Sequence, residues 1–162
     1  MKKKGMSKMY NLREAMDVAR KWATFSNCNS RKIGCVILQK HDDKYMLIGS
    51  GCNTTSDDLC NEGQCRKRFF GETEHSKFCN AIHAEESAIM DAIQSVDTDW
   101  ITGGIAVMTC GYPCRYCLTR LYEGGVTKLI LSNNTFYTPL DERFYNAHKD
   151  WFEVEIYKEP DN

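Results

Sequence analysis

The sequence lacks several features that would set a chain of 162 residues apart from ordinary globular domains. It has no apolar run long enough to span a bilayer, no internal repeat and no low-complexity tract. Neither charge sign is in excess, because 21 Lys and Arg residues stand against 22 Asp and Glu residues. This balance disfavours a general nucleic-acid binder, which needs a surplus of cations. The length fits one domain and is too short for a (β/α)₈ barrel of about 250 residues.

The N-terminus also lacks a recognisable secretory signal. Lys2, Lys3 and Lys4 are similar to the basic start of a signal peptide, but the apolar segment that should follow is missing. We therefore expect a cytoplasmic protein without a membrane partner. Residues 1–10 are expected to form a basic, flexible tail, and residues 11–162 a single domain.

Cysteine, in contrast, is abundant, with nine residues in the chain. In a secreted protein of this length, such a count would suggest disulfides. The odd number, the missing signal and a Cys-x-x-Cys pair with a histidine available favour reduced thiols and a bound metal instead.

Hydrophobic periodicity predicts a single α/β domain, with a mixed central sheet of about five strands and helices on both faces. Asn11 and Glu14 form a capping-box pattern at the start of the first helix. A polar, cysteine-rich insertion at about residues 52–81 is long enough to indicate a function of its own. The expected helices are 11–25, 83–96, 115–123 and 141–148, and the expected strands are 33–39, 45–50, 105–109, 128–132 and, at an edge, 151–157.

The most informative motif is His83-Ala84-Glu85, followed by Pro113-Cys114-Arg115-Tyr116-Cys117, in which Cys114 lies 31 positions after the histidine. One imidazole and two thiolates fill three corners of a zinc tetrahedron and leave the fourth for water, as in catalytic zinc sites. We predict that His83, Cys114 and Cys117 are the zinc ligands. Pairing His-x-Glu with Pro-Cys-x-x-Cys is the signature of zinc-dependent nucleobase deaminases, in which the glutamate is the catalytic acid and base.

Each half of this motif has a simpler interpretation by itself. An isolated histidine is more often a surface residue, and Cys-x-x-Cys also fits a redox dithiol or two core thiols. Cys110, Cys114 and Cys117 moreover share the spacing of radical S-adenosylmethionine enzymes, which hold a [4Fe–4S] cluster. Those enzymes need most of a barrel after the motif, and only 45 residues follow Cys117. We therefore assign Cys110 to a thiol beside the site.

The chemistry expected from the motif is hydrolytic deamination of cytosine to uracil. Zinc supplies hydroxide at neutral pH by lowering the pKa of water from 15.7 to about 7. Glu85 is expected to carry a proton to N3 of the ring and another to the departing ammonia. Main-chain groups around Ala84 and at the strand end from Thr109 to Tyr112 are expected to hold the edge of the base.

On these residues the chain resembles the deoxycytidylate (dCMP) deaminase family of the cytidine deaminase-like superfamily. The resemblance spans about residues 15–130, and it includes residues 30–37, similar to the family's first strand, and residues 49–53, similar to its Gly-x-Gly-Tyr-Asn. It implies a homo-oligomeric hydrolase, acting on a cyclic amidine, that converts dCMP to dUMP. It also implies that Asn53 contacts the sugar or the phosphate.

The chain departs from the family pattern at Cys52, Thr54 and Ser87, and at Gly111-Tyr112 before the proline. The departure at Cys52 and Thr54 leaves regulation by dCTP and dTTP open. Those at Ser87 and at Gly111-Tyr112 are expected near the base and sugar, and they leave dCTP, a modified dCMP or a nucleoside open as the substrate. A rival function is an editing enzyme that flips a base out of RNA or DNA, but such enzymes need basic grooves and stacking aromatics. A catalytically dead zinc module is a third possibility, against which Glu85 argues.

The resemblance further implies a second, structural zinc, because members of this family often carry one near the cysteine-rich insertion. The alternative is a set of free surface thiols. The candidate ligands are Cys60, His75 and Cys79, followed by Cys65 and Cys28. For the nucleotide phosphate the candidates are Arg31, Lys32 and Tyr137, and the basic run Arg66, Lys67 and Arg68.

Overall fold

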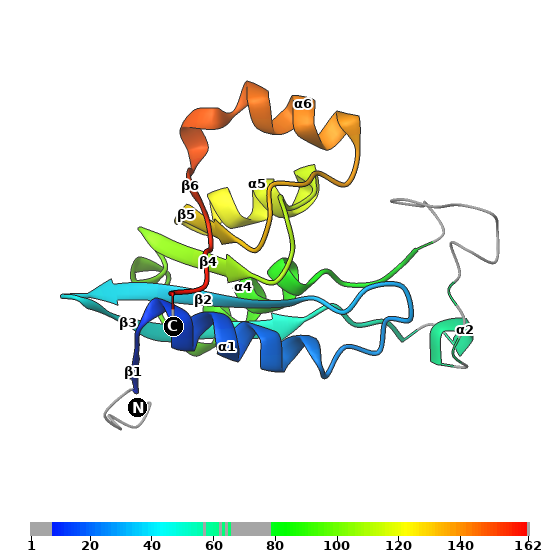
Figure 1. Ribbon diagram of the computed structural model, residues 1–162, viewed down its shortest axis with the longest axis horizontal. Helices are drawn as coiled ribbons and strands as arrows, with labels where there is room; N and C mark the ends of the chain where they lie inside the picture. Colours follow the sequence, from blue (N-terminus) through cyan, green and yellow to red (C-terminus); the bar gives the residue numbers. More distant parts are fainter. Residues whose placement is uncertain (1–7, 57, 62, 64, 66–78, 162) are drawn as a thin grey trace.

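A six-stranded mixed sheet, in the order β1-β3-β2-β4-β5-β6, forms the centre of the protein (Figure 1). The computed structural model describes residues 8–56, 58–61, 63, 65 and 79–161. The strands are β1 (Met9–Tyr10), β2 (Gly34–His41), β3 (Lys44–Cys52), β4 (Gly104–Met108), β5 (Val126–Leu131) and β6 (Glu153–Ile156). The α-helices are α1 (Leu12–Ala23), α2 (Asp58–Asn61), α4 (Ala84–Ser95), α5 (Arg115–Glu123) and α6 (Pro139–Ala147), and the 3₁₀ helices are η1 (Thr98–Trp100) and η2 (Lys149–Trp151).

The sheet is antiparallel on one side and parallel on the other. Strands β1, β3, β2 and β4 pair antiparallel, whereas β4, β5 and β6 run parallel. The sequence predicts this mixed sheet, the β2–β3 hairpin and the edge position of β6. The sixth strand is a difference from the expected five. It comes from Met9 and Tyr10, which we expected in the tail and which pair with Met46 and Tyr45 at the other edge.

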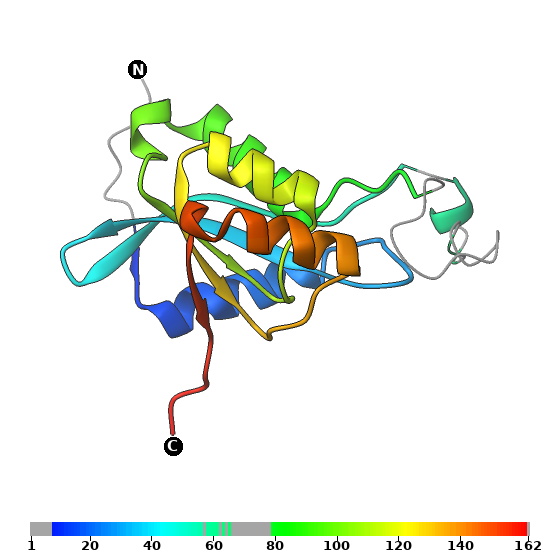
Figure 2. The ribbon, with the colours of Figure 1, turned by 90° about the horizontal axis from the view of Figure 1, so that it is seen from above.

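Helices cover both faces of the sheet, as the sequence predicts (Figure 2). Side chains alternate along a strand, so successive residues of β2 point to opposite faces. Val36 and Leu38 pack in the core with α1, and Cys35 and Ile37 pack in the core with α4 and α5. The same alternation holds in β4 and β5, and it places the starts of α4 and α5 on one side of the sheet.

Helix α1 begins where the sequence predicts. The Glu14 N–H donates to the Asn11 side chain at 2.9 Å, and the Asn11 N–H donates to the Glu14 carboxylate at 2.9 Å. This reciprocal pair is a capping box, which satisfies two N–H groups that the helix itself leaves without partners. The helix then buries Ala15, Met16 and Ala19 against the sheet.

Two glycines of β3 bring α4 close to the sheet. A Cβ atom at Gly49 would lie 2.4 Å from the carbonyl oxygen of Ala88, and one at Gly51 would lie 2.7 Å from the Cβ atom of Ser87. Only a residue without a side chain allows so close an approach. The departure at Ser87 thus belongs to the contact between α4 and β3.

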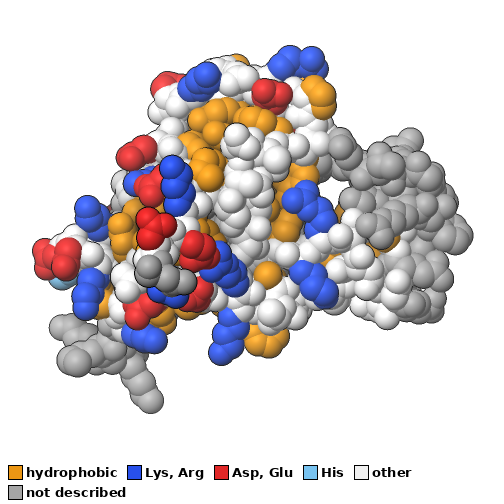
Figure 3. Space-filling view, in the orientation of Figure 1, with side chains coloured by type: hydrophobic (Ala, Val, Ile, Leu, Met, Phe, Trp, Pro, Cys, Tyr) orange, Lys and Arg blue, Asp and Glu red, His pale blue; other side chains and the backbone are white. Residues whose placement is uncertain are grey.

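Helix α6 begins at Pro139, two residues before the predicted start. The Thr138 side chain accepts from the Asp141 N–H, and proline is well suited to the first helical position because it has no N–H to satisfy. Figure 3 shows acidic and basic side chains interspersed on one face of the molecule, with apolar side chains between them. None of the helices in the described part of the chain combines the length and hydropathy needed to cross a membrane.

Candidate metal centre and active site

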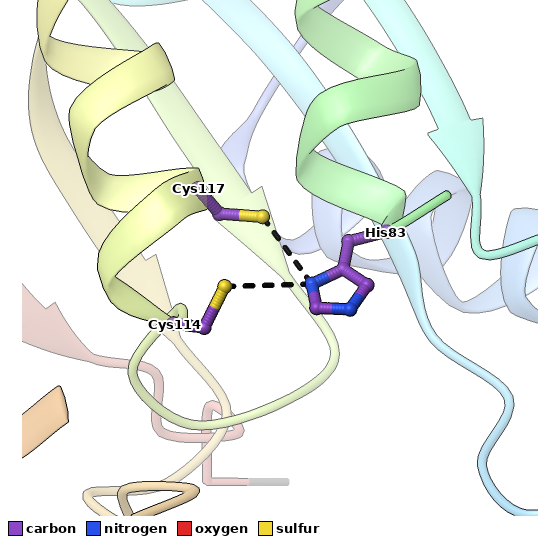
Figure 4. Close-up of side chains that lie close together, drawn as sticks. All are labelled: His83, Cys114 and Cys117. Carbon is purple, nitrogen blue, oxygen red and sulfur yellow. Dashed lines mark hydrogen bonds between the residues drawn. The ribbon is translucent and has the colours of Figure 1, made fainter. Parts of the chain in front are cut away.

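Two helix starts meet at the candidate metal centre (Figure 4). His83 is the residue before α4, and Cys114 is the residue before α5, with Cys117 in the first turn of α5. Both His83 and Cys114 have an extended backbone, and neither side chain caps the helix that follows it. The imidazole and the two thiols point toward one another instead.

The distances between these side chains fit a tetrahedral zinc ion. The His83 Nδ1 atom lies 3.6 Å from the Cys114 Sγ atom and 3.4 Å from the Cys117 Sγ atom. Zinc binds sulfur at about 2.3 Å and nitrogen at about 2.0 Å, so tetrahedral ligands lie about 3.5 Å apart. Within the described residues, no other group of three or more His, Cys, Asp or Glu side chains brings its ligand atoms within 4.8 Å of one another.

The electrostatics of Cys114 also suit a metal ligand. Hydrogen bonding to the Cys117 thiol, and then to His83, lowers the pKa of Cys114 to about 4. The thiolate is the form of cysteine that binds metal. The Cys114 and Cys117 side chains are buried, so a metal held here would be shielded from bulk water on this side.

Glu85 lies in the first turn of α4 and is buried, with only 2% of its surface exposed. Burial is the main cause that raises its pKa above the ordinary value. The Cys110 thiol donates to the Glu85 Oε1 atom at 3.8 Å. Burial also raises the pKa of Cys110 well above its usual range, so this residue keeps its proton. Cys110 is therefore a thiol beside the carboxylate, and it is not among the three grouped ligands.

Tyr137 and Arg31 extend this contact toward the surface. The Arg31 guanidinium lies over the Tyr137 ring, 4.5 Å from its centroid. Burial is the main cause that raises the pKa of Tyr137, and the nearby Cys110 and Glu85 raise this pKa further. The Tyr137 hydroxyl therefore stays protonated. Arg31 is exposed, and the row Arg31, Tyr137, Cys110 and Glu85 thus leads from the solvent to the buried carboxylate. All four residues are candidates from the sequence, but only the structure shows that they lie in a row.

Tyr112 lies in an aromatic cluster beside this row. Its ring stacks on Phe136 at 4.1 Å between centroids and contacts Tyr145 at 4.6 Å. Its N–H donates to the Thr135 carbonyl at 2.8 Å. The Tyr112 N–H is therefore already used within the protein. The contact with the base that we predict for this strand end would come from its other main-chain groups. Ala84, the other main-chain candidate, is the first residue of α4 and is fully buried.

Asn53 is buried and holds the segment that carries Arg31. Its side-chain N–H donates to the Arg31 carbonyl at 2.7 Å, and its side-chain oxygen accepts from the Ile33 N–H at 2.8 Å. A carboxamide has two donor hydrogens and two acceptor lone pairs, so part of its capacity is used within the protein. The sugar or phosphate contact that we predict for Asn53 would add to this internal role.

The described candidates for a second zinc, Cys28, Cys60, Cys65 and Cys79, are not among the grouped ligands of the first site. The Asn29 side chain donates to the Cys60 carbonyl, and Asn27 donates to Asn61 at 3.3 Å, so the segments holding Cys28 and Cys60 are neighbours. Cys79 is exposed and Cys65 is half-buried. Among the described residues, no three of these ligands come together. His75 and the basic run Arg66, Lys67 and Arg68 lie outside the described residues.

Asp141 lies beside this site, and the sequence does not indicate a role for it there. Its carboxylate is fully buried and accepts from the N–H of Arg115, the residue that follows Cys114. The sequence Thr138-Pro139-Leu140-Asp141 is typical of a helix start. That pattern alone does not reveal that the carboxylate reaches a second helix.

Comparison with known proteins agrees with the geometry. The chain is 29% identical to the deoxycytidylate deaminase of Saccharomyces cerevisiae over 122 residues, and 28% identical to that of Schizosaccharomyces pombe over 120 residues. These matches cover 74% and 71% of this chain but 36% and 34% of the yeast proteins, so the chain spans about a third of the length of these relatives.

A solved structure establishes the likeness of the fold. The dCMP deaminase of cyanophage S-TIM5, in complex with dCMP and dUMP, superposes with a TM-score of 0.65 and is 22% identical. The superposition covers 90% of this chain and 95% of the phage chain. A family model described as the cytidine and deoxycytidylate deaminase zinc-binding region matches residues 9–133. The chain therefore belongs to the cytidine and deoxycytidylate deaminase family.

Proposed function

We propose that this protein is a zinc-dependent hydrolase that deaminates a free cytosine nucleotide, with dCMP and water as substrates and dUMP and ammonia as products. The observation that carries the proposal is the buried carboxylate of Glu85 at the same helix start as His83, one of three grouped metal ligands. The names of the yeast relatives support dCMP as the nucleotide.

The residues of the candidate site have separate roles in this reaction. His83, Cys114 and Cys117 would hold zinc, which supplies the Lewis acidity that makes water nucleophilic at neutral pH. Glu85 takes a proton from the water that attacks C4 and delivers it to N3 of the ring. It then takes the remaining proton of the new hydroxyl group and gives it to the amino nitrogen, which leaves as ammonia. Burial suits a carboxyl group to this work, because its raised pKa lets it act as both acid and base. The Cys110 thiol restrains one oxygen of the carboxylate.

Arg31 is the residue that we propose for the nucleotide phosphate. It is exposed at the outer end of the row that begins at Glu85, and its guanidinium packs on the ring of Tyr137. Arginine binds phosphate through two parallel hydrogen bonds, and hydrogen bonds to charged groups contribute about 1.5–3 kcal/mol. On the face shown in Figure 3, basic and acidic side chains are mixed, which favours a small nucleotide over a polynucleotide.

Ammonia release from deoxycytidine, dCMP, dCTP and single-stranded DNA, measured in parallel, tests the substrate. We expect dCMP to give the highest kcat/KM. In Arg31→Ala, kcat/KM for dCMP should fall by about 10–100-fold while that for deoxycytidine stays unchanged. Arg13→Ala, which removes an exposed cation from α1, serves as the control. A preference for single-stranded DNA, or equal losses on dCMP and deoxycytidine, would refute the assignment.

We also propose a second, structural zinc in the insertion at residues 52–81. The Thr54–Ile82 bridge closes the base of this segment, with N–H···O bonds of 3.0 and 2.8 Å. A bound metal would stabilise a segment with little apolar content, because its binding free energy adds to the folding free energy. Elemental analysis of the purified protein should find two zinc ions per chain. One zinc per chain would show that the second site does not exist.

We also propose that the protein is a homo-oligomer. Met90 and Ile93 on α4 are about half exposed, as are Tyr116 and Tyr122 on α5. Met90 and Ile93 also line one pocket, together with Arg120, so two exposed apolar side chains lie side by side there. Exposed apolar surface of this kind is typical of a contact between protein chains. Light scattering should therefore return a mass of two or more chains, and a monomer at micromolar concentration would contradict this.

A further inference from the structure

We infer that Asp141 is a positioning residue for the metal centre, because its carboxylate fixes the helix start from which Cys114 and Cys117 project. This inference rests on the proposed zinc site. It concerns a residue on another helix, α6, which lies alongside α5 (Figures 1 and 2).

The Asp141 carboxylate joins the two helices. One oxygen, Oδ1, accepts from the backbone N–H of Arg115 at 3.0 Å and from the Arg115 guanidinium at 3.3 Å. The other oxygen, Oδ2, accepts from the Thr138 hydroxyl at 2.8 Å. The carboxyl group is fully buried, and hydrogen bonds to a buried charge are stronger than those between neutral groups.

The bond to the Arg115 N–H matters because of where it lies in the chain. The first N–H groups of a helix have no partner within the helix, and a side chain at the preceding residue often supplies an acceptor. Here that residue is Cys114, whose thiol makes no capping bond and lies beside His83 instead. Asp141 brings an acceptor and a negative charge to this helix start from outside, which leaves Cys114 available for the metal.

Two roles for Asp141 make different predictions. If Asp141 only docks α6 on α5, its loss lowers the stability of the protein and leaves the affinity of folded protein for zinc unchanged. If it positions the ligands, its loss weakens zinc binding even in a folded protein. Removing a hydrogen bond that orients metal ligands typically costs about 10–100-fold in metal affinity.

Two substitutions at Arg115 isolate the backbone hydrogen bond. Arg115→Pro removes the N–H at the first position of α5, where proline is tolerated, and the extended backbone of Cys114 (φ −65°, ψ 161°) is the conformation that precedes proline. Arg115→Ala removes the guanidinium and keeps the N–H. Zinc affinity, measured by competition with a chelating indicator, should fall about 10–100-fold in Arg115→Pro and less than about fivefold in Arg115→Ala.

Substitutions at Asp141 test the same contact from the other side. Asp141→Ala should weaken zinc binding as much as Arg115→Pro does, and Asp141→Asn, which keeps an acceptor, should restore most of the affinity. Circular dichroism of the metal-free proteins shows whether each variant is folded. If Asp141→Ala is unfolded, the comparison of Arg115→Pro with Arg115→Ala decides the question instead. If folded Arg115→Pro binds zinc with wild-type affinity, the role of Asp141 is wrong but the proposed function stands. If the wild-type protein binds no zinc, the proposed function is wrong as well.

Discussion

Glu85→Gln should lower kcat for dCMP by at least about 100-fold, because general acid–base catalysis typically contributes 10²–10⁴-fold. The amide has the shape of the carboxylate and can still accept from the Cys110 thiol, but it cannot carry a proton from water to the base. Glu85 is not one of the three grouped ligands, so the zinc content should stay at the wild-type value. Ammonia release and elemental analysis measure the two quantities on the same sample.

The neighbouring Glu86 provides a matched control. It follows Glu85 on α4, but its carboxylate pairs with Arg120 at 3.1 Å and its side chain is 26% exposed. Glu86→Gln makes the same chemical change one position away, and we expect it to retain kcat within about threefold, since ion pairs exposed to solvent contribute little. If Glu85→Gln were as active as Glu86→Gln, Glu85 would not be the proton carrier.

Cys117→Ala should lose the catalytic zinc and all measurable activity. It leaves two protein ligands where a catalytic zinc normally has three. The zinc content should fall by one ion per chain, and ammonia release from dCMP should fall to the background rate.

Cys110→Ala is the control for this change, because it removes a buried thiol that lies outside the ligand group. It should keep its zinc. Loss of zinc in Cys110→Ala together with retention in Cys117→Ala would require a different ligand set.

The elements that the sequence predicts are those with a repeated hydrophobic pattern. Helix α1 combines such a pattern with a capping box, and its predicted start is confirmed. Strand β1 has two residues, too few to show any alternation, and it exists because Met9 and Tyr10 pair with the edge of β3. The start of α6 depends on the cap at Thr138, which is a local signal without hydrophobic periodicity.

Within the site, the ligand motif is local in sequence and so can be recognised there. His83 and Glu85 lie in one helical turn, and Cys114 and Cys117 lie in another. Only the structure shows that these two turns lie next to each other. Contacts between distant segments are different, as Asp141 shows, because the sequence does not reveal which helix its carboxylate reaches. Asn53 is a similar case, since its residue type suggests ligand binding and its contacts lie with the backbone of Arg31 and Ile33.

The measurement that tests the account most directly is the conversion of dCMP by the zinc-loaded protein in water enriched in ¹⁸O. Hydrolytic deamination should yield dUMP that carries one ¹⁸O atom at C4, together with one ammonia per dUMP, because the new oxygen comes from water. Mass spectrometry reads the label, and an ammonia assay reads the stoichiometry. If zinc-loaded protein forms no dUMP, or forms dUMP without the label, the proposed reaction is wrong.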